Sequence, residues 1–231
     1  MSTRLSRMLT ILTLAAALPA AAEGGEQPAA EDLVRAEILA DGAEVRPGAT
    51  FPVGVRLRIA EGWHVYWKNP GDSGLPTDVA WRLPAGWEAG DLGWPVPEVS
   101  WAGPIINYGY EGEVVLLASV HAPADAAGAI AIGADVSWLV CNPETCIPGK
   151  AKLDRTIEPG VATGDADALR AAREELPQPA PWKARLAAGP DHVTLAIAEP
   201  ALAEARIASA YFFPTANDVI DHAAEQRLER G

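Results

Sequence analysis

The sequence predicts a mainly β protein in which a β-sandwich is followed by one short helix and the start of a second β-domain. Over residues 53–59, valine, leucine and isoleucine alternate with glycine and arginine, which is the period-two pattern of a strand with one buried face. Breaks rich in glycine, proline and asparagine separate this segment from further strand candidates at residues 33–40, 63–68, 78–83, 113–121, 130–141 and 147–157. Strands of this number and spacing are typical of a sandwich.

A single helix is expected after the sandwich, over residues 165–176. Asp165 or Asp167 can act as its N-cap, since a carboxylate accepts hydrogen bonds from the free amides of a first turn. Its apolar residues fall on one side and are Leu169, Ala172 and Leu176. The prolines at 177, 179 and 181 then predict a stiff, extended spacer, because each proline fixes φ. We therefore place a domain boundary there.

Beyond the prolines, the chain predicts an incomplete β-domain. Residues 182–186 and 192–198 are expected to form a hairpin around Gly189 and Pro190, and residues 210–213 another strand. So few strands cannot bury both faces of a sheet. The expected organisation is a signal peptide at 1–22, a sandwich at 31–160, a helix with linker at 161–181 and a partial second β-domain at 182–231.

The N-terminus has the features of a secretory signal. Arg4 and Arg7 precede an apolar run over residues 8–18, and small residues follow at 20–22. The run is shorter than the roughly 20 residues that a membrane helix needs. We therefore expect export to the periplasm, either as a free protein or as a fragment of a membrane-anchored one.

The charge balance argues against a nucleic-acid partner. The chain has 18 basic and 31 acidic side chains, for a net charge of −13. An acidic surface repels phosphates, whereas binding them requires clustered lysine and arginine, which the sequence lacks. No cofactor motif is present either, so a cysteine pair is the expected source of any chemistry.

The chain's two cysteines, Cys141 and Cys146, are expected to face each other across a hairpin. The face of residues 130–141 that carries Cys141 is the more polar one. Asn142 and Pro143 favour a turn, after which residues 147–157 return as a strand. In an exported protein such a pair forms a disulfide by default.

This disulfide can be a redox couple or a structural link. Closing so short a loop stabilises a fold by only about 2 kcal/mol, yet it keeps both thiols together after reduction. No helix is expected to follow Pro143, and Glu144 adds a negative charge, so the thiols should be weakly activated. Lys150 and Lys152 are expected to be solvated strand residues.

Metal binding and carbohydrate binding are the alternative functions that the residues suggest. The reduced cysteines could bind Cu(I), which favours thiolates. The four histidines, at 64, 121, 192 and 222, lack the spacing of a zinc site. The aromatic run at positions 63, 66, 67, 81, 87, 94 and 101 favours core packing over a carbohydrate platform. The polar segment 69–74 is explained by turn chemistry, although Asp72 and Ser73 could bond loop amides.

Two segments, 136–148 around the cysteines and the Gly-Trp-His-Val-Tyr-Trp-Lys-Asn-Pro block at 62–74, resemble the N-terminal periplasmic domain of DsbD-type thiol:disulfide interchange proteins. The resemblance runs from Val34 to Pro159 and is nearest to the ScsB-like branch. It implies an immunoglobulin-like sandwich in which Cys141 and Cys146 match the redox pair. DsbD itself has five residues between its cysteines and this chain has four, which puts the local geometry and the choice of partner in question.

The resemblance also implies partners and a cap. Electrons would come from a membrane-embedded donor of the DsbD or ScsB type and pass to periplasmic thioredoxin-like or disulfide isomerase proteins. In full-length relatives the donor domain follows in the same chain, so here the expectation is either that another polypeptide supplies the electrons or that the gene is truncated. The family covers its cysteines with an aromatic loop, for which residues 107–112 are the candidate, with Tyr110 first and Tyr108 second. Relatives suggest Cys146 for partner contact, but with the altered spacing both Cys146 and Cys141 stay candidates for the attacking residue. ScsB-like proteins are also associated with copper tolerance.

Overall fold

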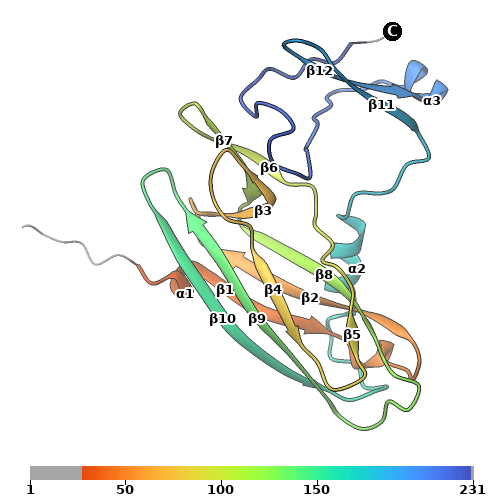
Figure 1. Cartoon of the computed structure of the whole chain (residues 1–231). Helices are drawn as coiled ribbons and strands as arrows, with labels where there is room; N and C mark the ends of the chain where they lie inside the picture. Colours follow the sequence, from red (N-terminus) through yellow and green to blue (C-terminus); the bar gives the residue numbers. More distant parts are fainter. Residues whose placement is uncertain (1–27, 230–231) are drawn as a thin grey trace, which may run out of the picture.

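The computed structural model describes residues 28–229, so the expected signal peptide at 1–22 lies outside the described residues. Within that range the chain forms two β-sheets that pack face to face, a helix on the outside of one sheet, and a C-terminal hairpin at one end (Figure 1). The mainly β, sandwich-type fold predicted from the sequence is confirmed. None of the described helices is long and apolar enough to cross a membrane.

The first sheet is antiparallel, with the order β1-β2-β8-β5. Its strands are β1 (Val34–Ala40), β2 (Thr50–Ile59), β8 (Glu113–His121) and the short β5 (Glu88–Ala89). The face of β2 that the sequence predicted to be buried is confirmed, because Val53, Val55 and Leu57 are fully buried. These side chains form one wall of the core.

The second sheet has the order β10-β9-β3-β7-β6, and β4 pairs with a separate part of β9. Its strands are β3 (His64–Gly71), β4 (Asp78–Arg82), β6 (Glu98–Ala102), β7 (Ile105–Tyr110), β9 (Ile130–Cys141) and β10 (Cys146–Ile157). The even-numbered residues of β9, from Ile130 to Val140, are buried in the core as the sequence predicts. The odd-numbered residues therefore point out of the sandwich.

The prediction that residues 107–112 form a loop is wrong. Most of this segment belongs to strand β7, which pairs with β6. Asn107 and Gly109 have turn-forming character, yet both lie in β7 and pair with β6. The Asn107 side chain accepts hydrogen bonds from the backbone amide and hydroxyl of Ser73, at 3.2 and 3.0 Å. This side-chain bonding explains a buried asparagine inside a strand.

Helix α2 (Ala166–Glu174) lies on the outer face of the first sheet. Leu169 and Ala172, on the predicted apolar side, are buried against Leu39, Val115 and Leu117. This second, smaller cluster explains why these three strand residues point away from the main core and are still apolar.

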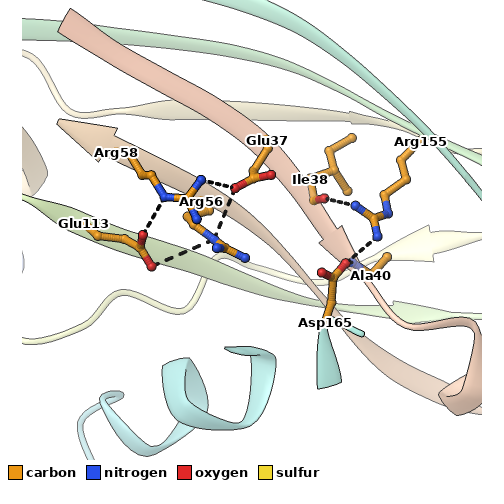
Figure 2. A network of polar contacts seen from close by, with 8 residues as sticks. All are labelled: Glu37, Ile38, Ala40, Arg56, Arg58, Glu113, Arg155 and Asp165. Carbon is orange, nitrogen blue, oxygen red and sulfur yellow. Dashed lines mark hydrogen bonds and ion pairs between the residues drawn. The ribbon is translucent and has the colours of Figure 1, made fainter. Parts of the chain in front are cut away.

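Asp165 occupies the N-cap position of α2, but its side chain does not cap the helix. Instead Oδ2 accepts a 3.1 Å hydrogen bond from the Ala40 amide and pairs with the Arg155 guanidinium at 2.6 Å. Arg155 also donates to the Ile38 carbonyl at 3.1 Å. Figure 2 shows how these contacts join β1 of one sheet, β10 of the other and the start of the helix.

A second group of charges in Figure 2 lies on the outer surface of the first sheet. Arg58 bridges Glu37 and Glu113 at 2.8 Å each, and Arg56 lies 3.4 Å from Glu37. Because these carboxylates are half exposed, each pair contributes little to stability. The Asp165 cluster is less exposed and is the stronger link between elements.

The C-terminal part begins with a hairpin of β11 (Lys183–Ala188) and β12 (Val193–Ala198), as predicted, whose residues are all exposed. A short helix α3 (Pro200–Glu204) follows, and the strand expected at 210–213 is wrong because that segment is irregular. The other short elements that were not predicted are β5, β6, the helix α1 (Ala30–Leu33) and a 3-10 helix at Gly42–Glu44. The boundary expected at residues 177–181 stays a prediction.

Residues 211–226, here called the tail segment, pack back against the second sheet. The Phe213 ring makes edge contacts with Trp67 and Tyr108 at 6.1 and 5.2 Å between centroids. The side-chain NH2 group of Asn69 donates a 2.8 Å hydrogen bond to the Pro214 carbonyl. The tail segment therefore covers the end of the sandwich where β3 and β7 extend beyond the first sheet (Figure 1).

Replacing Asp165 with asparagine is expected to lower the free energy of unfolding by about 1–3 kcal/mol, because a half-buried, charge-assisted interaction is lost. Urea denaturation measures this difference. Asp167→Asn is the matched control, since Asp167 is on the same helix, is exposed and pairs with Arg170 on the helix surface. The control should change stability by less than about 0.5 kcal/mol. Equal effects would contradict the role given to Asp165.

Candidate redox site

The two cysteines close the end of the β9–β10 hairpin with a disulfide. Cys141 is the last residue of β9, Cys146 the first of β10, and they are cross-strand partners with Cα atoms 4.1 Å apart. Asn142 shapes the turn between them. Its side-chain oxygen accepts hydrogen bonds from the amides of Glu144 and Thr145, at 3.0 and 2.8 Å. The hairpin therefore holds both sulfurs together by backbone geometry as well as by the covalent bond.

The two cysteines differ sharply in exposure. Cys141 is 1% exposed although it lies on the outward face of β9, whereas Cys146 is exposed to solvent. Thiol–disulfide exchange requires an incoming thiolate to reach a sulfur in line with the S–S bond. Of the two sulfurs, that of Cys146 is therefore the one that an incoming thiolate can reach.

Tyr66 of β3 is the side chain that covers Cys141. Its hydroxyl donates a 3.0 Å hydrogen bond to the Cys141 sulfur, and its side chain is only 2% exposed. Burial raises the pKa of the Tyr66 phenol, so the hydroxyl keeps its proton and remains a donor. A donor aimed at this sulfur favours it most when it carries negative charge, as it does on cleavage of the disulfide.

A loop over residues 72–77 covers Tyr66 in turn. Gly74 lies against the phenol ring with φ of +102°, where any side chain would overlap the ring. Pro76 forms an isolated bridge with Tyr66. The loop is fixed to β7 because the Asp72 carboxylate accepts the Ile106 amide at 2.8 Å and Ser73 bonds Asn107. Asp72 and Ser73 were expected to bond loop amides, whereas their partners are a backbone amide and a side chain of strand β7, which anchor the loop above Tyr66.

His64 stands beside both residues. It is the direct cross-strand partner of Cys141 in the pairing of β3 with β9, so the two side chains share the outward face. Its ring meets that of Tyr66 edge to face at 5.1 Å. Its Nε2 atom is buried and has no hydrogen-bond partner among residues 28–229. Burial lowers the pKa of His64, and the opposing charge of Glu111 only partly offsets this effect.

The tyrosines predicted to form the cap lie elsewhere. Tyr110 pairs with Val65, which pairs with Val140, so it lies on the core face of the sheet and not on that of Cys141. Its hydroxyl donates to the Pro95 carbonyl at 2.8 Å. Tyr108 is fully buried, and its hydroxyl oxygen lies 3.1 Å from Nδ1 of His222. Burial raises the pKa of both phenols. The structure gives the contact with the Cys141 sulfur to Tyr66 instead.

Sequence reasoning missed Tyr66 and His64 as site residues. It placed Tyr66 among core aromatics and His64 among scattered histidines. One signal was available, since positions 64 and 66 share a face of the predicted strand at 63–68. The pairing of this strand with β9 could not be read from the sequence.

Residues 28–229 hold no cluster of three or more histidine, cysteine or acidic side chains that could bind a metal ion. Lys150 and Lys152 are exposed on β10, in register with Ser137 and Asp135 rather than with the disulfide. The described surroundings of the cysteines are therefore a phenol, an imidazole and the hairpin itself.

The chain is similar to known proteins in both sequence and fold. The family described as thiol:disulfide interchange protein DsbD, N-terminal, matches residues 35–158, which is more than half of the chain. The structure is similar to the N-terminal periplasmic domain of ScsB from Proteus mirabilis, with a TM-score of 0.58 and 18% identity. That match covers 74% of this chain and 66% of the ScsB domain, so the chain spans slightly less than two thirds of its length.

A second solved structure, the reduced N-terminal domain of DsbD from Neisseria meningitidis, matches with a TM-score of 0.36 and 18% identity. It covers 56% of this chain and 92% of that domain. No curated protein matches the chain. At these identities the ScsB comparison supports the sandwich fold, and the family match rests on residues 35–158.

Removing the Tyr66 ring should expose the Cys141 sulfur. In a Cys146→Ser background, where Cys141 is the sole thiol, Tyr66→Ala is expected to speed alkylation by iodoacetamide about tenfold or more. Tyr66→Phe is the control, because it keeps the ring and loses only the hydroxyl. The rates follow from mass spectrometry of timed samples. Equally slow alkylation in the parent and Tyr66→Ala would show that another group covers the sulfur.

Gly74→Ala should displace the Tyr66 ring, since the added methyl group overlaps it and the backbone φ is positive. We expect a loss of about 2 kcal/mol or more in unfolding free energy, together with faster alkylation of Cys141. Gly112→Ala is the matched control, with φ of +65° but open space around the new methyl group. It should cost about 1 kcal/mol and leave alkylation unchanged.

Proposed function

Because the chain belongs to the family of the N-terminal domain of the thiol:disulfide interchange protein DsbD, we propose that it relays electrons through a reversible Cys141–Cys146 disulfide. Cys146 forms the mixed disulfide with each partner, and Cys141 opens or closes the internal bond. The observation that carries this proposal is the contrast between a buried Cys141 and an exposed Cys146.

The reducing reaction begins with both cysteines as thiols. The Cys146 thiolate attacks a partner disulfide, forms a mixed disulfide and releases one partner thiolate. The Cys141 thiolate then attacks the Cys146 sulfur, which closes the internal disulfide and releases the second partner thiolate. Two electrons pass to the partner, and the two protons of the cysteines end on its two thiols.

The same geometry allows the reverse reaction, in which a donor reduces the disulfide back to two thiols. A donor thiolate attacks the exposed Cys146 sulfur, and Cys141 leaves as a thiolate within 3.0 Å of the Tyr66 hydroxyl. A hydrogen bond to the leaving sulfur favours cleavage, because a stabilised thiolate is the better leaving group. Tyr66 therefore assists the opening of the bond and covers the buried sulfur between encounters.

The partners in this proposal are a membrane-embedded donor of the DsbD or ScsB type and periplasmic thioredoxin-like or disulfide isomerase acceptors. A periplasmic location agrees with that of the ScsB domain to which the structure is similar. Thioredoxin-like proteins attack through an exposed, low-pKa cysteine, which suits a target with one accessible sulfur. Cu(I) binding by the reduced pair is the competing proposal, and it needs no partner disulfide.

The first test is the reduction potential of the Cys141–Cys146 pair in the folded protein. Equilibration with glutathione or dithiothreitol buffers, followed by thiol trapping, should give a value of roughly −270 to −180 mV. The fold should remain intact in both states, as followed by circular dichroism. A value below about −300 mV, or unfolding on reduction, would identify a structural link and end the relay proposal.

Single-cysteine variants test the order of attack. Cys141→Ser, activated at Cys146 as its nitrothiobenzoate disulfide, should accumulate a stable mixed disulfide with a thioredoxin-like protein that keeps only its attacking cysteine, because both resolving thiols are absent and nitrothiobenzoate leaves. Cys146→Ser should form little of it, since the remaining sulfur is buried. Non-reducing electrophoresis separates these outcomes, and the opposite pattern would reverse the assigned roles.

A further inference from the structure

The closing step of the proposed relay requires Cys141 to lose a proton in a buried place. A thiol attacks a disulfide only as its thiolate, and burial without a nearby positive charge disfavours that form. Among the described residues, the phenol at Cys141 is a proton donor with its own pKa raised, so it cannot act as the base. A second proton acceptor beside Cys141 would therefore speed the step at neutral pH.

His64 is placed to be that acceptor. It is directly opposite Cys141 across the β3–β9 ladder, where facing Cβ atoms are about 4.5–5.5 Å apart. Its ring is held by the edge contact with Tyr66, whose hydroxyl reaches the same sulfur. Its Nε2 atom is buried without a hydrogen-bond partner in the described chain. A buried polar atom left unpaired in this way is uncommon and calls for a functional explanation.

We propose that His64 takes the proton of the Cys141 thiol when Cys141 resolves the mixed disulfide. In the opening direction His64 first takes a proton from the attacking donor thiol or from solvent, and then gives it to the departing Cys141 thiolate. This proposal rests on the relay proposed above and adds to it the residue that moves the proton. Cys141–SH and neutral His64 become a thiolate and an imidazolium. The thiolate forms the bond to Cys146 as the bond from Cys146 to the partner sulfur breaks, and the imidazolium proton then passes to solvent or to the released thiolate.

The charges around His64 suit this role. The titratable groups that face it are Cys141 on β9, Cys146 on β10, Tyr66 on its own strand and Glu111 after β7. Burial keeps the imidazole neutral at pH 7 and able to accept a proton, since its pKa is lowered. Glu111 acts in the opposite direction and favours the imidazolium once it forms. An imidazole that is unprotonated at neutral pH can accept the thiol proton, and Glu111 reduces the cost of its protonated form.

The test is the pH dependence of the closing step. The reduced protein is mixed with 5,5′-dithiobis(2-nitrobenzoate), and the nitrothiobenzoate released on attack by Cys146 and then by Cys141 is followed by its absorbance. In the wild-type protein the second release should be nearly independent of pH from about 7 to 8.5, because His64 supplies the base. In His64→Gln it should be at least about tenfold slower at pH 7. Its rate should then rise about tenfold per pH unit and approach wild type in alkali.

Controls separate this role from a structural one. His121→Gln changes an exposed histidine at the end of β8 and should keep the wild-type profile. Tyr66→Phe should keep the flat profile, since a protonated phenol is not a base. A His64→Gln rate that equals wild type, or is lower by a constant factor at every pH, would overturn the role of His64 and leave the relay standing. If the wild-type protein itself gives no second release, the relay fails first.

Discussion

The pairing of β3 with β9 is the constraint on which the site depends. This contact is short, with His64 opposite Cys141 and Val65 opposite Val140. It places an imidazole and a phenol on the outward side of the cysteine and continues the core on the inward side with Val65 and Val140. Because facing residues of neighbouring strands share a face, a slip of one residue would move Tyr66 to the core and separate it from the sulfur. The register of one strand pair therefore sets the chemistry of the disulfide.

Burial of one sulfur and exposure of the other follow from that pairing and from the loop above it. Asp72 and Ser73 fix the loop to β7, Gly74 makes room for the Tyr66 ring, and the ring encloses Cys141. Cys146 belongs to the edge strand β10, which has no neighbour beyond it in the described sheet, and so it stays in water. In the proposed relay, this arrangement assigns partner contact to the exposed sulfur and leaves the charge of the other sulfur to be stabilised inside the protein.

Most strands could be predicted because their signal is local. The alternation along β2 and β9 marks the face that a two-layer sandwich buries, and both patterns are found in the structure. The predictions were wrong where a side chain forms hydrogen bonds with an element that is distant in the sequence. Asn107 and Gly109 have the character of a turn, yet they lie in β7, since the Asn107 amide accepts bonds from Ser73. Asp165 has the position of a helix cap, yet it bonds Ala40 and Arg155 instead.

The sequence by itself determined the sandwich, the hairpin and the cysteine pair at its end, because strand periodicity and turn chemistry act between near neighbours in the chain. Only the tertiary structure decided which side chains meet the sulfurs. Tyr66 and Cys141 are 75 positions apart, and the Tyr110 that was expected at the sulfur lies on the opposite face of the same sheet. Local patterns state that a strand has two faces, whereas the order and register of strands decide what each face touches.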